Sequence, residues 1–265
     1  MIKNAGLKFL ISICILLQGL NAYASTYVSL SPSVTEVIYA LNAQDNLLGV
    51  SKNCNYPQAV KEKPVIGDNF YVNMEMLVKL KPDYIFAMTS AKPKMGEIAL
   101  TKTKPVYIEY SSIEEIYKSI RYIAELTEAK TDAQSLINSI KQKIEDSKTK
   151  NPKRILYLVQ TNPMITTGSK SFITDIIRKS GHIAVTEDIP YYYPGITFEY
   201  AIKTNPDIII CGFYSDTSTL KRLFPNAKIL YLDEKQLDII NRGGPRVYEA
   251  VKLFSELNFS SSPIR

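Results

Sequence analysis

The sequence predicts an α/β protein with two lobes joined by one long, stiff helix. Short β-like runs alternate with helical patterns, as in parallel sheets covered by helices. One amphipathic helix interrupts this alternation at residues 132–148, and a short motif occurs once on each side of it. With 265 residues, of which 45% are hydrophobic and 22% charged, the chain can bury a substantial core.

The first 24 residues are interpreted as a cleavable secretory signal. Lys3 and Lys8 give it a basic start, and residues 9–17 form an apolar run that is too short for a membrane anchor. Ala22 and Ala24 fit the small-x-small cleavage rule, so we expect cleavage near Ala24 and an exported, soluble mature chain. The alternative is a buried N-terminal helix.

The charge of the expected mature chain argues against a nucleic-acid partner. Without the signal, 30 basic residues stand against 26 acidic ones. This excess is small, and the lysines are scattered rather than gathered in the clustered stripe that nucleic-acid binding requires.

The cysteines and the single histidine give few options for metal or redox chemistry. Cys54 and Cys211 remain after cleavage, and they either stay unpaired or form a disulfide in an oxidising compartment. One histidine excludes a His-rich metal site within the chain. His182 follows Ser180-Gly181 and is interpreted as a solvated turn residue, with a haem or metal-chelate ligand as the alternative.

Residues 25–130 are expected to form the N-terminal α/β lobe. Ser33 and Glu36 have capping-box spacing at the start of a helix through residue 41, and Ser112 and Glu115 repeat this spacing before a second helix. Asn73 can cap a helix through residue 79. The predicted strands of this lobe are 27–30, 47–50, 84–87 and 105–108.

The helical connector is assigned to residues 131–150, and the C-terminal α/β lobe to residues 151–265. A helical connector is stiff, so we do not expect a large hinge closure. The predicted strands of the second lobe are 154–159, 208–211 and 229–232, and its predicted helices lie near 172–180, 197–203, 217–224 and 246–257.

An internal repeat relates residues 75–85 to residues 199–209. Glu, Lys, Pro, Asp and Ile recur at one fixed offset, which predicts a short helix, a Pro-Asp stop and a buried strand in each lobe. A glutamate near a helix N-terminus is favoured by the helix dipole, which alone explains either residue. Two at equivalent places, Glu75 and Glu199, would also suit a symmetric partner with two basic sockets.

The order and spacing of several short motifs resemble a known family over nearly the whole mature chain. The chain is similar to the helical-backbone class of periplasmic substrate-binding proteins of ABC importers, and within that class to the cobalamin-binding members. The motifs lie at residues 27–36, 49–51, 55–57, 65–68, 73–75, 167–171, 193–194, 198–199 and 242–246.

This resemblance implies two Rossmann-like lobes with a ligand cleft between them and a long helix across their back. It implies a monomeric periplasmic protein that is not an enzyme, needs no cofactor or metal, and delivers its ligand to an ABC permease dimer with ATPase subunits. Glu75 and Glu199 match the family's glutamates that pair with permease arginines.

The resemblance also implies a set of ligand-binding residues, with tyrosine or phenylalanine near some positions where cobalamin binders carry tryptophan. An aromatic-lined cleft suits a large, planar ligand, and arginines suit a phosphate, carboxylate or amide-oxygen rim. Core packing, a surface loop and a salt bridge are the structural alternatives for these residues. The set is Tyr56, Phe70, Tyr71, Met88, Tyr192, Tyr193, Arg242 and Arg246, in a chain with 18 Tyr and no Trp.

The expected ligand is a corrinoid; a ferric siderophore, haem or another metal chelate is the alternative on the same scaffold. An exported enzyme is a third hypothesis, although the sequence has no nucleophile elbow, Walker loop or run of metal ligands. Glycosidase-like chemistry would require the Glu75 and Glu199 carboxyls to lie within about 10 Å of each other. A stand-alone sensor domain is a fourth hypothesis.

Overall fold

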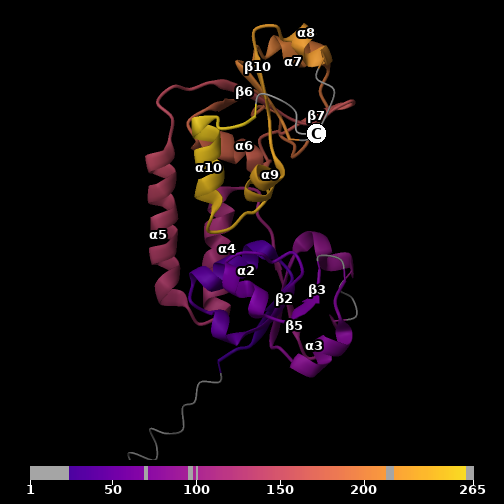
Figure 1. The fold of residues 1–265 in the computed structure, drawn as a ribbon, viewed down its shortest axis with the longest axis vertical. Helices are drawn as coiled ribbons and strands as arrows, with labels where there is room; N and C mark the ends of the chain where they lie inside the picture. The colour runs from indigo at the N-terminus through magenta and orange to yellow at the C-terminus, as the bar shows by residue number, and fades with distance from the viewer. Residues whose placement is uncertain (1–23, 69–70, 95–97, 100, 213–217, 261–265) are drawn as a thin grey trace, which may run out of the picture.

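The computed structural model describes residues 24–68, 71–94, 98–99, 101–212 and 218–260. It confirms the α/β architecture with two lobes, each built on its own sheet. The molecule is elongated, with one lobe at each end and the helices α4 (Ile113–Leu126) and α5 (Lys130–Ser147) running between them (Figure 1). The interpreted signal lies outside the described residues, apart from Ala24. Within the described part, no helix is long and apolar enough to span a bilayer.

The N-terminal lobe contains a five-stranded parallel sheet with the order β3-β2-β1-β4-β5. All four predicted strands are present, and the structure adds the three-residue strand β3. The elements are β1 (Tyr27–Ser29), β2 (Leu47–Ser51), β3 (Val65–Gly67), β4 (Tyr84–Met88) and β5 (Lys104–Ile108), with helices α2 (Pro32–Ala40) and α3 (Met74–Leu80) besides α4, and 3-10 turns at Gln44–Asn46, Gln58–Glu62 and Thr89–Lys94.

The second lobe has the strand order β10-β9-β6-β7, and β8 pairs with the start of β6. The β7 strand is antiparallel to β6, whereas β8, β9 and β10 run parallel to their neighbours. The elements are β6 (Arg154–Thr161), β7 (Met164–Thr166), β8 (Ile183–Ala184), β9 (Ile208–Cys211), β10 (Lys228–Tyr231), α6 (Phe172–Lys179), α7 (Phe198–Lys203), α8 (Ser218–Leu223), α9 (Glu234–Ile240) and α10 (Val247–Glu256).

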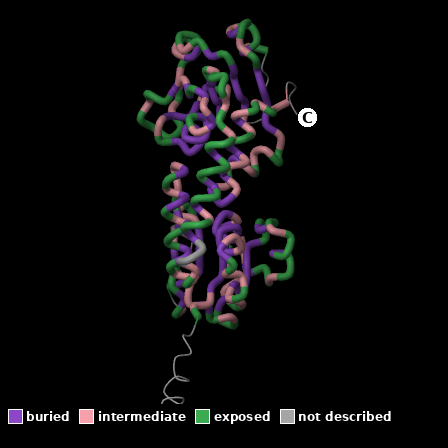
Figure 2. Tube along the Cα trace, turned by 90° about the vertical axis from the view of Figure 1, so that its left-hand side faces the viewer, coloured by how far each residue is buried: buried purple, intermediate pink, exposed green. Residues whose placement is uncertain are grey.

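One hydrophobic core runs through both lobes and the helices between them. Side chains alternate across a strand, so Ile155 and Tyr157 of β6 join this shared core, whereas Leu156 and Leu158 join a second cluster on the other face of the sheet. The shared core also takes in Tyr27 of the first sheet and the inner stripes of α4, α5 and α10. Figure 2 shows buried and exposed residues alternating along the helical segments between the two lobes. The lobes are therefore separate as sheets and continuous in their packing.

The internal repeat is confirmed down to individual hydrogen bonds. Asn73 caps α3 by accepting from the Met76 N–H, and Thr197, located 124 positions later, caps α7 by accepting from the Tyr200 N–H. Both units then place a residue in the left-handed region, at Lys81 (φ 48°) and Asn205 (φ 45°).

The aspartates that follow also play matching roles. Asp83 Oδ2 accepts from the backbone N–H of Thr26, and Asp207 Oδ2 accepts from that of Arg154, both at 2.8 Å. Each aspartate thereby ties the start of its own strand to a neighbouring strand. Several hydrogen bonds from Thr26 also lower the pKa of Asp83.

Two of the local interpretations are wrong. The α2 helix begins at Pro32 with Ser31 at its N-cap, so Ser33 and Glu36 do not form a capping box. His182 is buried rather than solvated: its Nδ1 accepts from the Lys153 N–H and its Nε2 lies 3.0 Å from the Phe254 carbonyl oxygen. These partners define a neutral ring with the proton on Nε2, and burial lowers its pKa.

Both remaining cysteines are free, buried thiols. The Cys54 thiol lies near the hydroxyls of Thr35 and Ser51 in the N-terminal lobe. Cys211 ends β9 in the other lobe, where burial raises its pKa to about 12. Cys54 and Cys211 therefore remain unpaired and do not form a disulfide with each other.

Candidate functional site

The expected ligand residues of the first lobe lie at the carboxyl ends of its strands. Tyr56 follows β2, Tyr71 follows β3 and Met88 ends β4. Tyr56 and Tyr71 are exposed, and Met88 is half-buried. This is the edge at which open α/β sheets bind ligands, in the crevice outside the carboxyl ends of the strands. Phe70 lies outside the described residues.

Tyr192 and Tyr193 of the second lobe belong to an exposed loop that is fixed by its backbone. The Gly168 N–H donates to the Tyr192 carbonyl at 3.1 Å, and the Thr166 N–H donates to that of Pro194 at 3.0 Å. A Cβ on Gly168 would lie 2.4 Å from the Tyr191 carbonyl oxygen, so glycine permits this close approach. The loop thus presents tyrosine rings on a rigid base.

The two arginines lie at the junction of the lobes and are already engaged with carboxylates. Arg242 donates from Nη1 to Glu36 Oε1 at 3.0 Å, and its Nη2 lies 2.7 Å from Asp238 Oδ1. Arg246 forms a bidentate pair with Glu249 at 3.0 and 2.7 Å, and its Nη1 lies 3.7 Å from Glu36 Oε1. Three carboxylates therefore surround two guanidinium groups.

Glu36 is the residue of this site that sequence reasoning missed. It comes from α2 of the first lobe, its side chain is 2% exposed, and it meets arginines from the loop after α9 of the second lobe. Desolvation raises its pKa, while the hydrogen bond from Arg242 and the charge of Arg246 oppose that rise. Its local sequence carries no signal of this role, because its partner Arg242 lies 206 positions away.

A cavity of about 310 Å³ opens beside this ion-pair cluster. The Arg246 guanidinium stacks over the Tyr56 ring at 4.3 Å from the ring centroid, so residues expected on opposite walls of a cleft meet here. The lining is mainly aromatic and aliphatic, with three charged groups: Glu36, Tyr39, Ala40, Tyr56, Pro57, Leu136, Ser139, Ile140, Lys143, Pro245, Arg246 and Tyr248.

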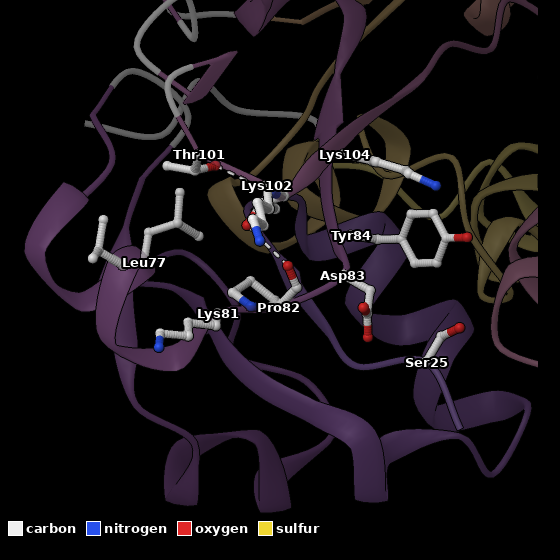
Figure 3. Close-up of a pocket in the computed structure, with 11 residues that line it drawn as sticks. Ser25, Leu77, Lys81, Pro82, Asp83, Tyr84, Thr101, Lys102 and Lys104 are labelled. Carbon is white, nitrogen blue, oxygen red and sulfur yellow. Dashed lines mark hydrogen bonds between the residues drawn. The ribbon is translucent and has the colours of Figure 1, made fainter. Parts of the chain in front are cut away.

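A second cavity, of about 510 Å³, has a different position (Figure 3). It lies where β4 and β5 begin, between Lys81, Asp83, Tyr84 and Lys104. This is the amino-terminal edge of the sheet, opposite to the edge that carries Tyr56, and none of the expected ligand residues lines the cavity. Sheet topology therefore favours the lobe junction as the candidate ligand site.

Glu75 and Glu199 are both exposed, in the first turns of α3 and α7. These helices lie at opposite ends of the molecule, on the same side of it in Figure 1. Neither glutamate has an ion pair with a described residue. A separation of this kind does not fit the paired acids of a glycosidase. Across the described ranges, no group of three or more His, Cys, Asp or Glu side chains is placed to hold a metal ion.

Comparisons with known proteins agree with this architecture. An uncharacterised ABC transporter substrate-binding lipoprotein of Bacillus subtilis is 29% identical over 248 residues, covering 86% of this chain and 78% of the relative. A vitamin B12-binding protein of Photorhabdus laumondii is 25% identical over 270 residues, covering 98% of this chain and 97% of the relative.

A solved structure from Staphylococcus epidermidis, described as a possible iron-binding periplasmic solute-binding protein, has the same fold. It superposes with a TM-score of 0.76 at 28% identity, covering 88% of this chain and 98% of that one. The family model described as "Periplasmic binding protein" matches residues 28–222, which span most of both lobes and all strands except the first residue of β1 and the whole of β10. The chain therefore belongs to the periplasmic binding protein family, whose members are substrate-binding proteins rather than enzymes.

Proposed function

We propose that this chain binds a corrinoid in the periplasm and delivers it to an ABC permease dimer with its ATPase subunits. The relatives named vitamin B12-binding proteins support the ligand class, because one of them aligns along almost the whole chain. In this proposal the chain acts as a monomer, with residues 1–24 removed near Ala24. Residues 25–130 and 151–265 then form the lobes, and residues 131–150 connect them.

The charge balance at the lobe junction is the observation that favours a corrinoid over a ligand rich in carboxylates. Arg242 and Arg246 share Glu36, and each has a second carboxylate, Asp238 or Glu249. Such compensated guanidinium groups have little attraction left for a ligand rich in carboxylates, such as haem with its two propionates. A corrinoid is edged mainly by neutral amides, which can accept hydrogen bonds from the Arg246 guanidinium without adding a net charge. All three nitrogens of the Arg242 guanidinium are already engaged, by Glu36, Asp238 and Asn55.

The aromatic residues support a broad, flat ligand. Tyr71, Tyr192 and Tyr193 are exposed, so their rings are available for stacking and their hydroxyls for orientation. Tyr56 is also exposed, although the Arg246 guanidinium already lies over its ring. We assign Phe70 and Met88 to the same ligand surface. Tyrosine thus takes the role that tryptophan has in the cobalamin binders this sequence resembles.

A ferric siderophore, haem or another metal chelate is the second candidate. The S. epidermidis structure, described as possibly iron-binding, favours it, as do the exposed tyrosine hydroxyls, because phenolate is an iron ligand. The two candidates differ in what the tyrosines do: they stack on a corrinoid, whereas one of them would coordinate iron.

The experiment is a thermal-shift and absorbance screen of the mature protein with cyanocobalamin, haemin and a ferric siderophore. We expect cyanocobalamin to raise the Tm, because a ligand that binds only the folded state stabilises it by mass action. Tyr56→Ala and Tyr192→Ala should each weaken binding about tenfold or more. Tyr122→Ala, which removes an exposed tyrosine of α4, should leave binding unchanged.

The alternative outcomes are decisive. Stabilisation by haemin or the siderophore, with none by cyanocobalamin, would establish the second candidate. A screen in which no corrinoid or chelate binds would overturn the proposed ligand class altogether.

A further inference from the structure

The two repeat units share an exposed aliphatic side chain that the fold does not use. Val78 of α3 is 55% exposed, and Ile202 of α7, 124 positions later, is 45% exposed. The preceding residues, Leu77 and Ala201, are also equivalent and are buried in the two lobes. Each helix therefore buries this residue and turns the next one, an aliphatic side chain, toward solvent.

Each exposed aliphatic residue shares a helix face with an exposed glutamate. Residues three apart are neighbours on a helix surface, so Val78 lies beside Glu75, and Ile202 beside Glu199. The glutamates have no ion pair with a described residue, although a lysine follows each of them four positions later. The same combination of an unpaired acid and an aliphatic side chain thus occurs at both ends of the molecule.

A single exposed valine or isoleucine would need no explanation, because much of any protein surface is apolar. The recurrence at equivalent positions of two units, whose caps and turns also match, does need one. We propose that Val78 and Ile202 are the apolar contacts of the surface that docks on the permease dimer. This inference rests on the proposed function, and it adds two residues to the docking surface.

The partner would be symmetric, with a basic side chain beside an apolar patch on each subunit. The exposed acids would then speed and orient the encounter, since long-range charge acts mainly on the association rate. The aliphatic side chains would be buried only in the final complex, where desolvated apolar contacts slow dissociation. Val78 also lines the cavity of about 510 Å³, which gives the first patch a recess into which a partner side chain can fit.

The test measures binding kinetics on nanodiscs. The nanodiscs hold the corrinoid-, haem- and ferric-chelate-type permease–ATPase complexes of the organism that carries this chain. We expect Val78→Ser with Ile202→Ser to raise the dissociation rate about tenfold to a hundredfold, with little change in the association rate. Glu75→Ala with Glu199→Ala should instead lower the association rate and weaken its dependence on salt. Thermal unfolding of each variant verifies that the fold is intact.

A matched control uses exposed aliphatic residues elsewhere, one in each lobe: Val65→Ser (54% exposed) with Ile183→Ser (42% exposed). This pair should leave the kinetics unchanged. If the Val78 and Ile202 variant dissociates like the wild type while the glutamate variant binds poorly, the present inference fails and the proposed docking stands. If the glutamate variant binds normally, or the wild type binds none of the complexes, the proposed docking itself fails.

Discussion

Glutamates at the lobe junction and at the two ends of the molecule have opposite environments. Glu36 is buried and paired with arginines from the other lobe, whereas Glu75 and Glu199 are exposed and have no ion pair with a described residue. The same side chain therefore serves to join segments in one place and stays available to a partner in the others. The difference indicates that pairing and burial, rather than residue type, separate structural acids from candidate docking acids.

The strongest test of the difference between Glu36 and the two exposed glutamates is to remove the Glu36 carboxylate. Glu36→Ala should lower the free energy of unfolding by about 3 kcal/mol, at the lower end of the cost of breaking a buried ion pair. Arg242 and Arg246 keep Asp238 and Glu249, which limits the loss. Urea unfolding followed by circular dichroism measures the change.

Glu249→Ala is the control for this prediction, because the Glu249 side chain is 31% exposed and half-exposed pairs contribute less. Its cost should stay below about 1 kcal/mol. Equal costs for the two variants would contradict the structural role of Glu36.

His182 extends the comparison to another buried polar residue that joins distant segments. The unfolded chain protonates its histidine near pH 6.5, while the folded protein resists protonation because the pKa is lowered. The contribution of His182 to the free energy of unfolding should therefore be fully present above pH 6.5 and should be lost as the pH falls below that value. Urea midpoints measured between pH 7.5 and 5.5 test this decline before most carboxylates titrate.

His182→Gln supplies the control, because glutamine can donate and accept but does not titrate. Its stability should vary less with pH over the same range. His182→Ala should cost about 1–3 kcal/mol by leaving the Lys153 N–H without its acceptor and by removing one of the two donors to the Phe254 carbonyl, which keeps the Leu257 N–H. An equal pH slope in the wild type and in His182→Gln would remove histidine from the explanation.

The smallest effects on stability are expected at the ends of the molecule, where each capping side chain stabilises only its own short helix. Asn73→Ala and Thr197→Ala each remove one cap and should cost about 1 kcal/mol. The double variant should be additive, because the sites lie in different lobes. A loss of 3 kcal/mol from either single change would show that the ends matter to stability as much as the junction does.

Sequence reasoning found the features that depend on local signals. Three such features lie where they were expected: the repeat at Glu75 and Glu199, the apolar stripe of α5 and the cap at Asn73. Each can be recognised from a few neighbouring residues. The edge strands β3 and β7 were missed because three residues carry too little alternation to distinguish a strand from a loop.

The errors concern residues whose partners are remote in the chain. Glu36 imitates a capping residue locally, but its arginine partner Arg242 is 206 positions away. His182 reads as a turn residue locally, yet it is covered by α10 and bonded to Phe254, 72 positions away. The pattern around a residue does not reveal such partners, and burial reverses the expected role of both side chains.

The shared core has a consequence for how this architecture can change. Each lobe has a hydrophobic cluster of its own on one face of its sheet, but the core on the other face is shared, because α4, α5 and α10 pack with residues of both sheets. Exchanging one lobe for that of a relative would expose an apolar surface shaped for the lost partner. Surface loops and the outer faces of the sheets can therefore change independently in each lobe, and new specificity can arise there. Residues of the shared core must change together, because they contact both lobes.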